Sequence, residues 1–246
     1  MVRASGLTKV YGRGENAVQA LREVSLEVAR GQLTAIMGPS GSGKSTLMHC
    51  LAGLDSPTGG QIVVDGLTIS DMSQRELTKV RRDRLGFVFQ AFNLIPTLTA
   101  RENITLPLDI ARRKTDPEWF DAVVDALSLR DRLHHKPAEL SGGQQQRVAC
   151  ARALISKPAV VFADEPTGNL DSTASREVLG FLRRSVDDMG QSVIMVTHDP
   201  NAASYSDRVL FLNDGVFVAE LESPNVDAVL EALRRLEHRG EEEAGQ

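Results

Sequence analysis

The segment Gly38-Pro39-Ser40-Gly41-Ser42-Gly43-Lys44-Ser45 decides the fold, because it matches the pattern G-x-x-x-x-G-K-[ST] at every fixed position. The apolar run Leu33-Thr34-Ala35-Ile36-Met37 precedes it and predicts a buried strand, and residues 45–53 predict a helix that ends at Gly53. A strand, a glycine-rich turn and a helix in this order form the setting in which the pattern cradles phosphate groups. The alternative is a linker rich in glycine and serine, which does not explain the two flanking elements.

The residue types of this segment suit a nucleotide triphosphate. Gly38, Gly41 and Gly43 let backbone N–H groups point inward as an anion-binding nest, and the following helix adds the positive end of its dipole. Lys44 supplies a positive charge to the β- and γ-phosphates, and the Ser45 hydroxyl is a ligand for Mg²⁺. We therefore expect this segment to bind a nucleotide triphosphate together with Mg²⁺.

A second part of the same site is predicted where another apolar strand ends. Residues 160–163 are apolar and lead directly into Asp164 and Glu165. Ligands of parallel sheets bind at the carboxyl ends of the strands, so Asp164 can hold Mg²⁺ through water. Glu165, one residue further, can polarise an attacking water molecule. An acidic strand end that caps the next helix is the alternative, and the phosphate-binding segment in the same chain favours catalysis.

Composition limits the class of protein. The chain has 246 residues, 41% hydrophobic and 25% charged, which is enough for one core or one core with a smaller lobe. The net charge of −5 gives no basic footprint, so we expect no nucleic-acid partner. Cys50 and Cys150 are interpreted as small buried hydrophobes in a reducing compartment. No segment approaches the roughly 18 apolar residues that span a bilayer, and residues 1–12 lack the apolar core of a signal peptide. These features predict a cytoplasmic protein whose membrane role depends on a partner.

The pattern along the chain predicts a parallel α/β core that a helical segment interrupts. The core is expected at about residues 1–90 and 157–224, and the helical subdomain at about 91–156, where Pro96, Pro107, Pro117 and Pro137 divide it into short elements. A helix over about 172–189 joins two buried strands as a right-handed crossover, and Asn213-Asp214-Gly215 predicts a hairpin. An amphipathic helix follows, and then an acidic, disordered tail at 241–246.

The sequence Leu140-Ser141-Gly142-Gly143-Gln144, between the two nucleotide elements, resembles the signature of the ATP-binding-cassette (ABC) ATPases. The resemblance covers nearly the whole chain, from about Leu7 to Glu220. It implies a P-loop NTPase core with a mostly parallel sheet, an antiparallel β subdomain and an inserted α-helical subdomain. It also implies that the chain hydrolyses ATP.

The signature is expected to be an anion site, because a serine hydroxyl and backbone N–H groups meet at the start of a helix. Two separate phosphate cradles in one subunit cannot serve one ATP unless they converge. The resemblance implies that they converge between two copies, in a head-to-tail homodimer that ATP closes. A plain helix cap is the alternative for the five residues taken alone.

The resemblance also assigns roles to individual residues. Tyr11 is implied to stack on adenine, Gln90 to sense Mg²⁺ and the γ-phosphate, and His198 to contact the γ-phosphate. The implied catalytic residues are Lys44, Gln90, Glu165 and His198, and the implied metal ligands are Ser45, Gln90 and Asp164. Residues Asn169, Leu170 and Asp171 are implied to cross the dimer interface. The implied ATP-binding residues are Tyr11, Gly38, Pro39, Ser40, Gly41, Ser42, Gly43, Lys44, Ser45, Thr46, Ser141, Gly142, Gly143 and Gln144.

Residues 90–100, 102–104 and 166–171, with the loop 11–18, resemble the MacB, LolD and FtsE subfamily. That resemblance implies a separately encoded integral membrane permease, a location at the inner face of the cell membrane, and export of a lipoprotein, peptide or drug-like substrate. A non-transport ATPase of the FtsE type, which regulates cell-envelope processes, is the alternative. ABC ATPases of DNA repair carry coiled coils or zinc modules, and translation factors carry two cassettes, so neither pattern fits.

Residues 91–110 are where a membrane partner is expected to dock. Their candidate contact residues are Phe92, Leu94, Ile95 and Leu98, for which simple core packing is an equal alternative.

Overall fold

A six-stranded sheet forms the centre of the molecule in the computed structural model, which describes residues 1–244 apart from the side chains of residues 15 and 237–244. Its strand order is β10-β9-β3-β8-β7-β6. The pairs among β3, β6, β7, β8 and β9 are parallel, and only β10 is antiparallel. The strands are β3 (Leu33–Met37), β6 (Leu85–Phe89), β7 (Val160–Asp164), β8 (Ser192–Val196), β9 (Arg208–Asn213) and β10 (Val216–Glu222).

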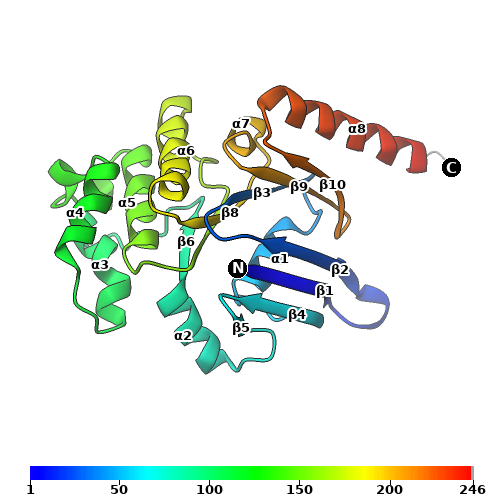
Figure 1. The fold of residues 1–246 in the computed structure, drawn as a ribbon, viewed down its shortest axis with the longest axis horizontal. Coiled ribbons are helices and arrows are strands. Elements are labelled where there is room, and N and C mark those ends of the chain that lie inside the picture. The colour runs from blue at the N-terminus through cyan, green and yellow to red at the C-terminus, as the bar shows by residue number, and fades with distance from the viewer. Residues whose placement is uncertain (245–246) are drawn as a thin grey trace.

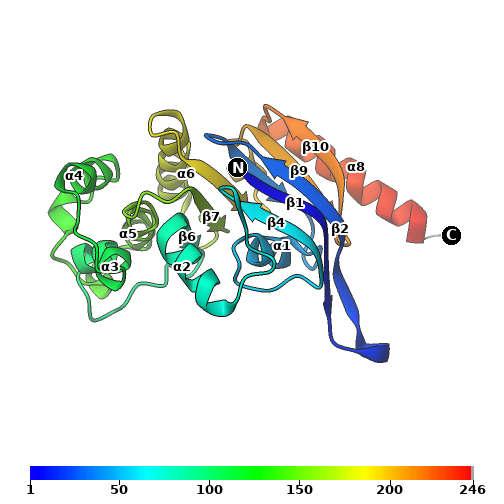
Figure 2. The ribbon, with the colours of Figure 1, turned by 60° about the horizontal axis from the view of Figure 1, so that its bottom comes forward.

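A second, antiparallel sheet of order β2-β1-β4-β5 lies beside the first (Figures 1 and 2). It is built from β1 (Val2–Tyr11), β2 (Val18–Val28), β4 (Gly59–Val64) and β5 (Leu67–Thr68). Helix α1 (Lys44–Leu51) packs its buried side chains in one hydrophobic cluster with residues of both sheets. This mostly parallel core with an antiparallel β subdomain is the fold class that the sequence predicted.

The helices α3, α4 and α5 gather at one end of the central sheet, drawn in green in Figures 1 and 2. They occupy the segment 91–156 of the predicted helical subdomain. Helix α6 packs beside α5 and against β8 of the central sheet. The helices are α2 (Gln74–Arg84), α3 (Ala100–Ile110), α4 (Pro117–Ala126), α5 (Gly142–Leu154), α6 (Ser172–Asp187), α7 (Pro200–Ala203) and α8 (Val226–Ala244), with short 3-10 turns at Gly14–Asn16, Arg130–Arg132 and Pro137–Glu139.

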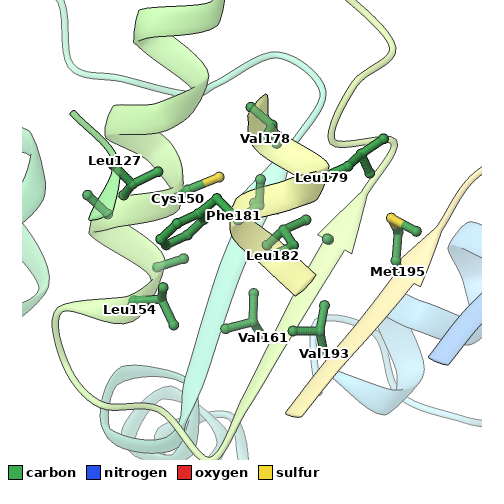
Figure 3. Packing of buried hydrophobic residues seen from close by; sticks show 14 of the residues in the cluster. Leu127, Cys150, Leu154, Val161, Val178, Leu179, Phe181, Leu182, Val193 and Met195 are labelled. Atoms are coloured by element: carbon green, nitrogen blue, oxygen red, sulfur yellow. The ribbon is translucent and has the colours of Figure 1, made fainter. Parts of the chain in front are cut away.

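The central strands are buried on both faces, and alternate residues enter two different clusters. Val161 and Ala163 of β7 face the cluster that holds Phe181 and Leu182 of α6, whereas Val160 and Phe162 face the α1 side. Figure 3 shows Val161 and Val193 beneath Phe181 and Leu182, with Cys150 of α5 beside them. Two-sided burial explains why these strands are continuous apolar runs.

The two cysteines are free and buried, as predicted. Burial raises the pKa of the Cys50 thiol to about 11 and that of Cys150 to about 12, so both stay protonated at neutral pH. Among the described residues, no helix is both long and apolar enough to cross a membrane.

Two local expectations differ from the structure. Pro107 lies inside α3 and does not divide it, because it stands in the last turn of the helix, where its missing N–H removes a single intrahelical bond. The segment expected as a disordered tail from residue 241 continues α8 to Ala244, because glutamate and alanine prolong an existing helix at little cost. Residues 245–246 of that tail lie outside the described residues.

Helix α5 approaches β6 so closely that only glycine fits at position 86. A Cβ atom on Gly86 would lie 2.5 Å from the carbonyl oxygen of Ala153. We expect Gly86→Ala to destabilise the protein by about 1–3 kcal/mol, since backbone must move to admit the methyl group. Urea unfolding followed by circular dichroism measures the change.

Gly180 in the middle of α6 provides the matched control. Its added Cβ would meet only the end of the Arg184 side chain, at 3.5 Å. Gly180→Ala should be neutral or stabilise by roughly 0.5–1 kcal/mol, because alanine has the better helix propensity. Equal stability of the Gly86→Ala variant and the wild type would contradict the close packing described for α5.

Candidate functional site

The functional segments meet where the parallel strands end. The phosphate-binding loop follows β3, Gln90 follows β6, Asp164 and Glu165 stand at the end of β7, and His198 follows β8. Parallel pairing places all these carboxyl ends at one edge of the sheet. Segments that are far apart in the sequence therefore lie together at one edge of the sheet.

The phosphate-binding loop wraps around its own lysine. The Lys44 Nζ atom donates to the carbonyl oxygens of Gly38 at 2.9 Å and Pro39 at 2.7 Å. Gly38 has φ 154° and Gly43 φ 102°, and a Cβ on either would collide with backbone oxygens of neighbouring strands. Burial lowers the pKa of Lys44, and the nearby Glu165 and Asp164 carboxylates oppose that shift. The loop thus presents a half-buried cation beside two carboxylates.

Asp164 and Glu165 differ in their surroundings. Burial raises the pKa of the Asp164 carboxyl, and the neighbouring Glu165 adds to the shift. A carboxylate in such a place gains from a nearby cation. No cluster of three or more His, Cys, Asp or Glu residues within the described part of the chain forms a metal site by itself.

The structure joins Glu165 to His198. The Nδ1 atom of His198 lies 2.8 Å from Oε1 of Glu165, and the carboxylate accepts from the tautomer that is protonated at Nδ1. Glu165 adopts a left-handed backbone with φ 46°, and its N–H donates to Val196 O of β8 at 2.9 Å. The Glu165 side chain is 18% exposed and that of His198 is 72% exposed. Both residues were singled out from the sequence, but their contact could not be predicted.

Gln90 and Asn169 form a reciprocal pair. Gln90 Nε2 donates to Asn169 Oδ1 at 3.2 Å, and Asn169 Nδ2 donates to the Gln90 carbonyl at 3.0 Å. Gly168 allows this approach, because a Cβ there would lie 2.7 Å from Gln90 Nε2. The loop predicted for the dimer interface is thereby fixed to the end of β6.

The signature opens α5 with a capping box. Gln144 N–H donates to Ser141 Oγ at 3.3 Å, and Ser141 N–H donates to Gln144 Oε1 at 2.9 Å. The Ser141 hydroxyl proton stays free to donate. A shallow hollow in front of this helix start is lined by the signature residues, Asn169, Leu170, Asp171 and Arg147. Arg147, which sequence reasoning missed, pairs with Glu177 at 3.0 Å and is 18% exposed.

One chain keeps the two predicted phosphate cradles apart. The residues that line the signature hollow come from α5, α6 and the loop 169–171, and none belongs to the phosphate-binding loop. Helices α5 and α1 lie well apart in both views of the ribbon (Figures 1 and 2).

Tyr11 stands at the end of β1 with its ring partly covered on one face. Its hydroxyl donates to Asp55 Oδ2 at 2.7 Å, and Lys9 Nζ lies 4.7 Å from the ring centroid. Lys9 also donates to Asp55 Oδ1 at 2.7 Å. Tyr11 as a whole is 42% exposed. Lys9 and Asp55 carried no signal in the sequence, because the fold decides that they contact Tyr11.

The loop after Gln90 is held by α5. Phe92 and Asn93 have φ 55° and 51°, and Arg152 of α5 donates to their carbonyls at 2.7 and 2.5 Å. Leu94 packs against the larger core cluster, whereas Ile95 is 39% exposed. Of the four predicted docking residues, Leu94 therefore serves the core.

An apolar groove opens beside this loop, between the central sheet and the helical subdomain. Its floor includes Phe87 and Phe89 of β6, and Leu106, Pro107 and Ile110 of α3 form one wall. Ile110 is 64% exposed. Arg81 and Arg82 of α2 and Arg152 of α5 supply the cationic rim.

The fold and these loops define a P-loop nucleotide-binding protein with an α/β core. Residues 21–168 match the family described as ABC transporter. The chain is 45% identical over 221 residues to the uncharacterized ABC transporter ATP-binding protein MJ0796 of Methanocaldococcus jannaschii, covering 87% of this chain and 94% of that protein. The chain therefore belongs to the ABC transporter family, as an ATP-binding domain with ATPase machinery.

Other relatives are named for export. The chain is 41% identical to the bacitracin export ATP-binding protein BceA of Halalkalibacterium halodurans, covering 90% of this chain and 88% of that protein. It is 45% identical to the macrolide export ATP-binding/permease protein MacB of Bdellovibrio bacteriovorus, covering 89% of this chain but only 34% of that protein. A solved dimeric structure of MJ0796 in a post-hydrolysis state, bound to ADP and Pi, superposes with a TM-score of 0.82 at 42% identity, covering 92% of this chain and 100% of that one.

The hold of Arg152 on the loop after Gln90 is testable. Lysine lacks the planar fork by which two nitrogens of one guanidinium reach the Phe92 and Asn93 carbonyls, so Arg152→Lys should weaken this pair of bonds. We expect amide hydrogen exchange over residues 91–98 to be about tenfold faster, because the lost bonds stabilise the closed loop by about 1.4 kcal/mol. Hydrogen exchange followed by mass spectrometry measures the change.

Arg130→Lys is the control, because Arg130 pairs with Asp125 on the surface of the same subdomain. An exposed pair contributes little, so exchange over 91–98 should not change. If Arg152→Lys also left that exchange unchanged, Arg152 would not be what holds the loop.

Proposed function

We propose that this chain is the ATP-hydrolysing subunit of an export system, and that it works as an ATP-dependent head-to-tail homodimer on a separately encoded membrane permease. The separation of the two phosphate cradles in one chain carries this proposal. A second copy, turned by a two-fold axis, would bring its signature hollow to the phosphate-binding loop of the first. The dimeric MJ0796 structure with ADP and Pi supports this arrangement.

The residues around the cradle suit a magnesium nucleotide. The Ser45 hydroxyl, the Gln90 amide oxygen and the Asp164 carboxylate are oxygen ligands of the kind that Mg²⁺ takes alongside phosphates. Asp164 fits this role because burial disfavours its charge, which a cation would compensate. Mg²⁺ would neutralise charge on the β- and γ-phosphates. Lys44 would exchange its carbonyl partners for phosphate oxygens.

Glu165 is the proposed general base. Its backbone is fixed to β8, and His198 orients its carboxylate. The Nε2 atom of His198 is left to face a γ-phosphate, so one side chain could hold both the base and the group under attack. As the water oxygen attacks the γ-phosphorus, Glu165 accepts a proton from that water. The bond from the γ-phosphorus to the bridging oxygen breaks, which gives Pi and ADP.

Tyr11 is the proposed adenine platform. Lys9 covers one face of its ring, which leaves the other face for the base. The bond to Asp55 fixes the ring before the nucleotide arrives, so less side-chain entropy is lost on binding.

The apolar groove beside the Gln90 loop is the proposed docking place of the permease. Its exposed Ile110 and aromatic floor suit the apolar face of a short helix. The names of the BceA and MacB relatives favour export of a peptide or drug-like substrate. The site geometry equally fits an FtsE-type ATPase that transmits force without transport, and the identity of the permease distinguishes the two. Binding to a permease would place the chain at the inner face of the membrane.

Glu165→Gln tests the catalytic base. It should reduce turnover by about 10²–10⁴-fold, the usual contribution of a general base. ATP binding should persist, because the phosphate-binding loop is untouched, and an ATP-bound dimer should accumulate. Phosphate release measures turnover, and size-exclusion chromatography with ATP measures the dimer. Turnover near that of the wild type would exclude the assignment of Glu165.

Lys44→Ala is the contrasting variant in the same assays. It should weaken ATP binding and hydrolysis together and abolish the ATP-dependent dimer, because the cation of the cradle is lost. A Lys44→Ala protein with unchanged ATP affinity would show that the loop is not the phosphate site.

Ile110→Glu tests the docking groove. A charge in the exposed apolar wall should abolish co-purification with a membrane subunit from detergent-solubilised membranes and preserve the ATPase activity of the isolated chain. Val18→Glu is the control, since Val18 is also 64% exposed but lies on β2, outside the groove. Equal recovery of the membrane subunit with both variants would place the contact elsewhere.

A further inference from the structure

Gln146, on the second turn of the signature helix α5, is fully buried and bridges two loops of the site. Its Nε2 atom donates to the carbonyl oxygen of Phe89 at 3.2 Å and to that of Pro166 at 2.5 Å. Both acceptors are carbonyl oxygens, so only the amide NH₂ group can bond both.

The two acceptors flank residues of the hydrolysis site. Phe89 is the last residue of β6 and directly precedes Gln90, and Pro166 directly follows Glu165. The Gln146 Oε1 atom is buried and has no partner among the described protein groups. A buried acceptor without a partner costs stability, so the two donor bonds give a reason for an amide at this position.

The helix that carries Gln146 also carries the signature at its start. Ser141 caps α5, and its first turn packs so closely on α6 that a Cβ on Gly143 would lie 2.7 Å from Ala174 Cβ. A shift of Phe89 or Pro166 would therefore pull on Gln146 and, through it, on the start of α5. In the proposed dimer, the start of α5 serves the ATP held by the other copy.

We propose that Gln146 is the positioning residue that couples the two ATP sites of the dimer. It ties the loops around a subunit's own Gln90 and Glu165 to the signature that this subunit offers to its partner's nucleotide. The inference rests on the proposed function, because coupling requires two shared sites. Loss of the amide should uncouple the sites and spare nucleotide binding to each subunit, since Gln146 touches no residue of the phosphate-binding loop in the described contacts.

The experiment compares Gln146→Met with the wild type in steady-state hydrolysis over a range of ATP concentrations. Two coupled sites give a Hill coefficient approaching about 2, and uncoupled sites give about 1. We expect a high coefficient for the wild type and a coefficient near 1 for Gln146→Met. Fluorescence titration of the monomer with a labelled ATP analogue should give equal affinity for both. If Gln146→Met does not fold, the isosteric Gln146→Glu, which lacks the donors when ionised, replaces it.

Gln191→Met is the matched control. Gln191 is also a buried amide, and it donates to the carbonyls of Pro158 and Ser192 at 3.2 Å each. These carbonyls lie where β7 and β8 begin, at the edge of the sheet opposite the site. This variant should lose stability but keep the Hill coefficient of the wild type. An unchanged coefficient in Gln146→Met, or an equal fall in Gln191→Met, overturns the proposal.

The Glu165→Gln variant, assayed separately, distinguishes a failure of this inference from a failure of the proposed function. If Glu165→Gln forms no dimer with ATP, the dimer proposal itself fails. If it forms the dimer and Gln146→Met hydrolyses ATP with the Hill coefficient of the wild type, only the role of Gln146 fails.

Discussion

Parallel pairing of β3, β8, β7 and β6 is the constraint on which the rest of the molecule depends. It sends four strands in one direction, so the phosphate-binding loop, Gln90, the two carboxylates and His198 all emerge at one edge. Each strand must then be buried on both faces, which requires α1 on one side and α5 and α6 on the other. The same constraint thus fixes the layers of the fold and the composition of the site.

Helix α5 combines a solvent-facing first turn with a second turn that is buried in the site of its own chain. Its first turn presents the signature to solvent, and its second turn reaches back through Gln146 to the loops of its own hydrolysis site. A helix that belonged only to the core would bury its first turn, and one that belonged only to an interface would not need Gln146. Both features are explained if the exposed turn completes the ATP site of another copy and the buried turn contacts the hydrolysis site of its own chain.

The sequence predicted what depends on local pattern and missed what depends on distant contacts. The strand, loop and helix around Lys44, the Asp214-Gly215 hairpin and the mostly parallel core follow from periodicity and turn residues. The Glu165–His198 and Gln90–Asn169 contacts could not be predicted from the sequence, because the order of the strands in the sheet decides which loops become neighbours. The prediction that Pro107 divides this segment was wrong, because Pro107 stands in the last turn of α3, where a proline removes only one intrahelical bond. The roles of the site residues remain predictions.

Phe89 shows how short the path from membrane partner to hydrolysis can be. Its side chain lines the apolar groove, its carbonyl accepts from Gln146, and the next residue is Gln90. A permease helix seated in the groove would contact Phe89 directly, so a displacement there reaches Gln90 along one peptide bond and the signature through one hydrogen bond. Coupling between sites needs an element that both sites bias, and in the proposed complex this strand end would be such an element without a longer network. The same geometry would serve an exporter and a mechanical transmitter, because only the permease beyond the groove distinguishes them.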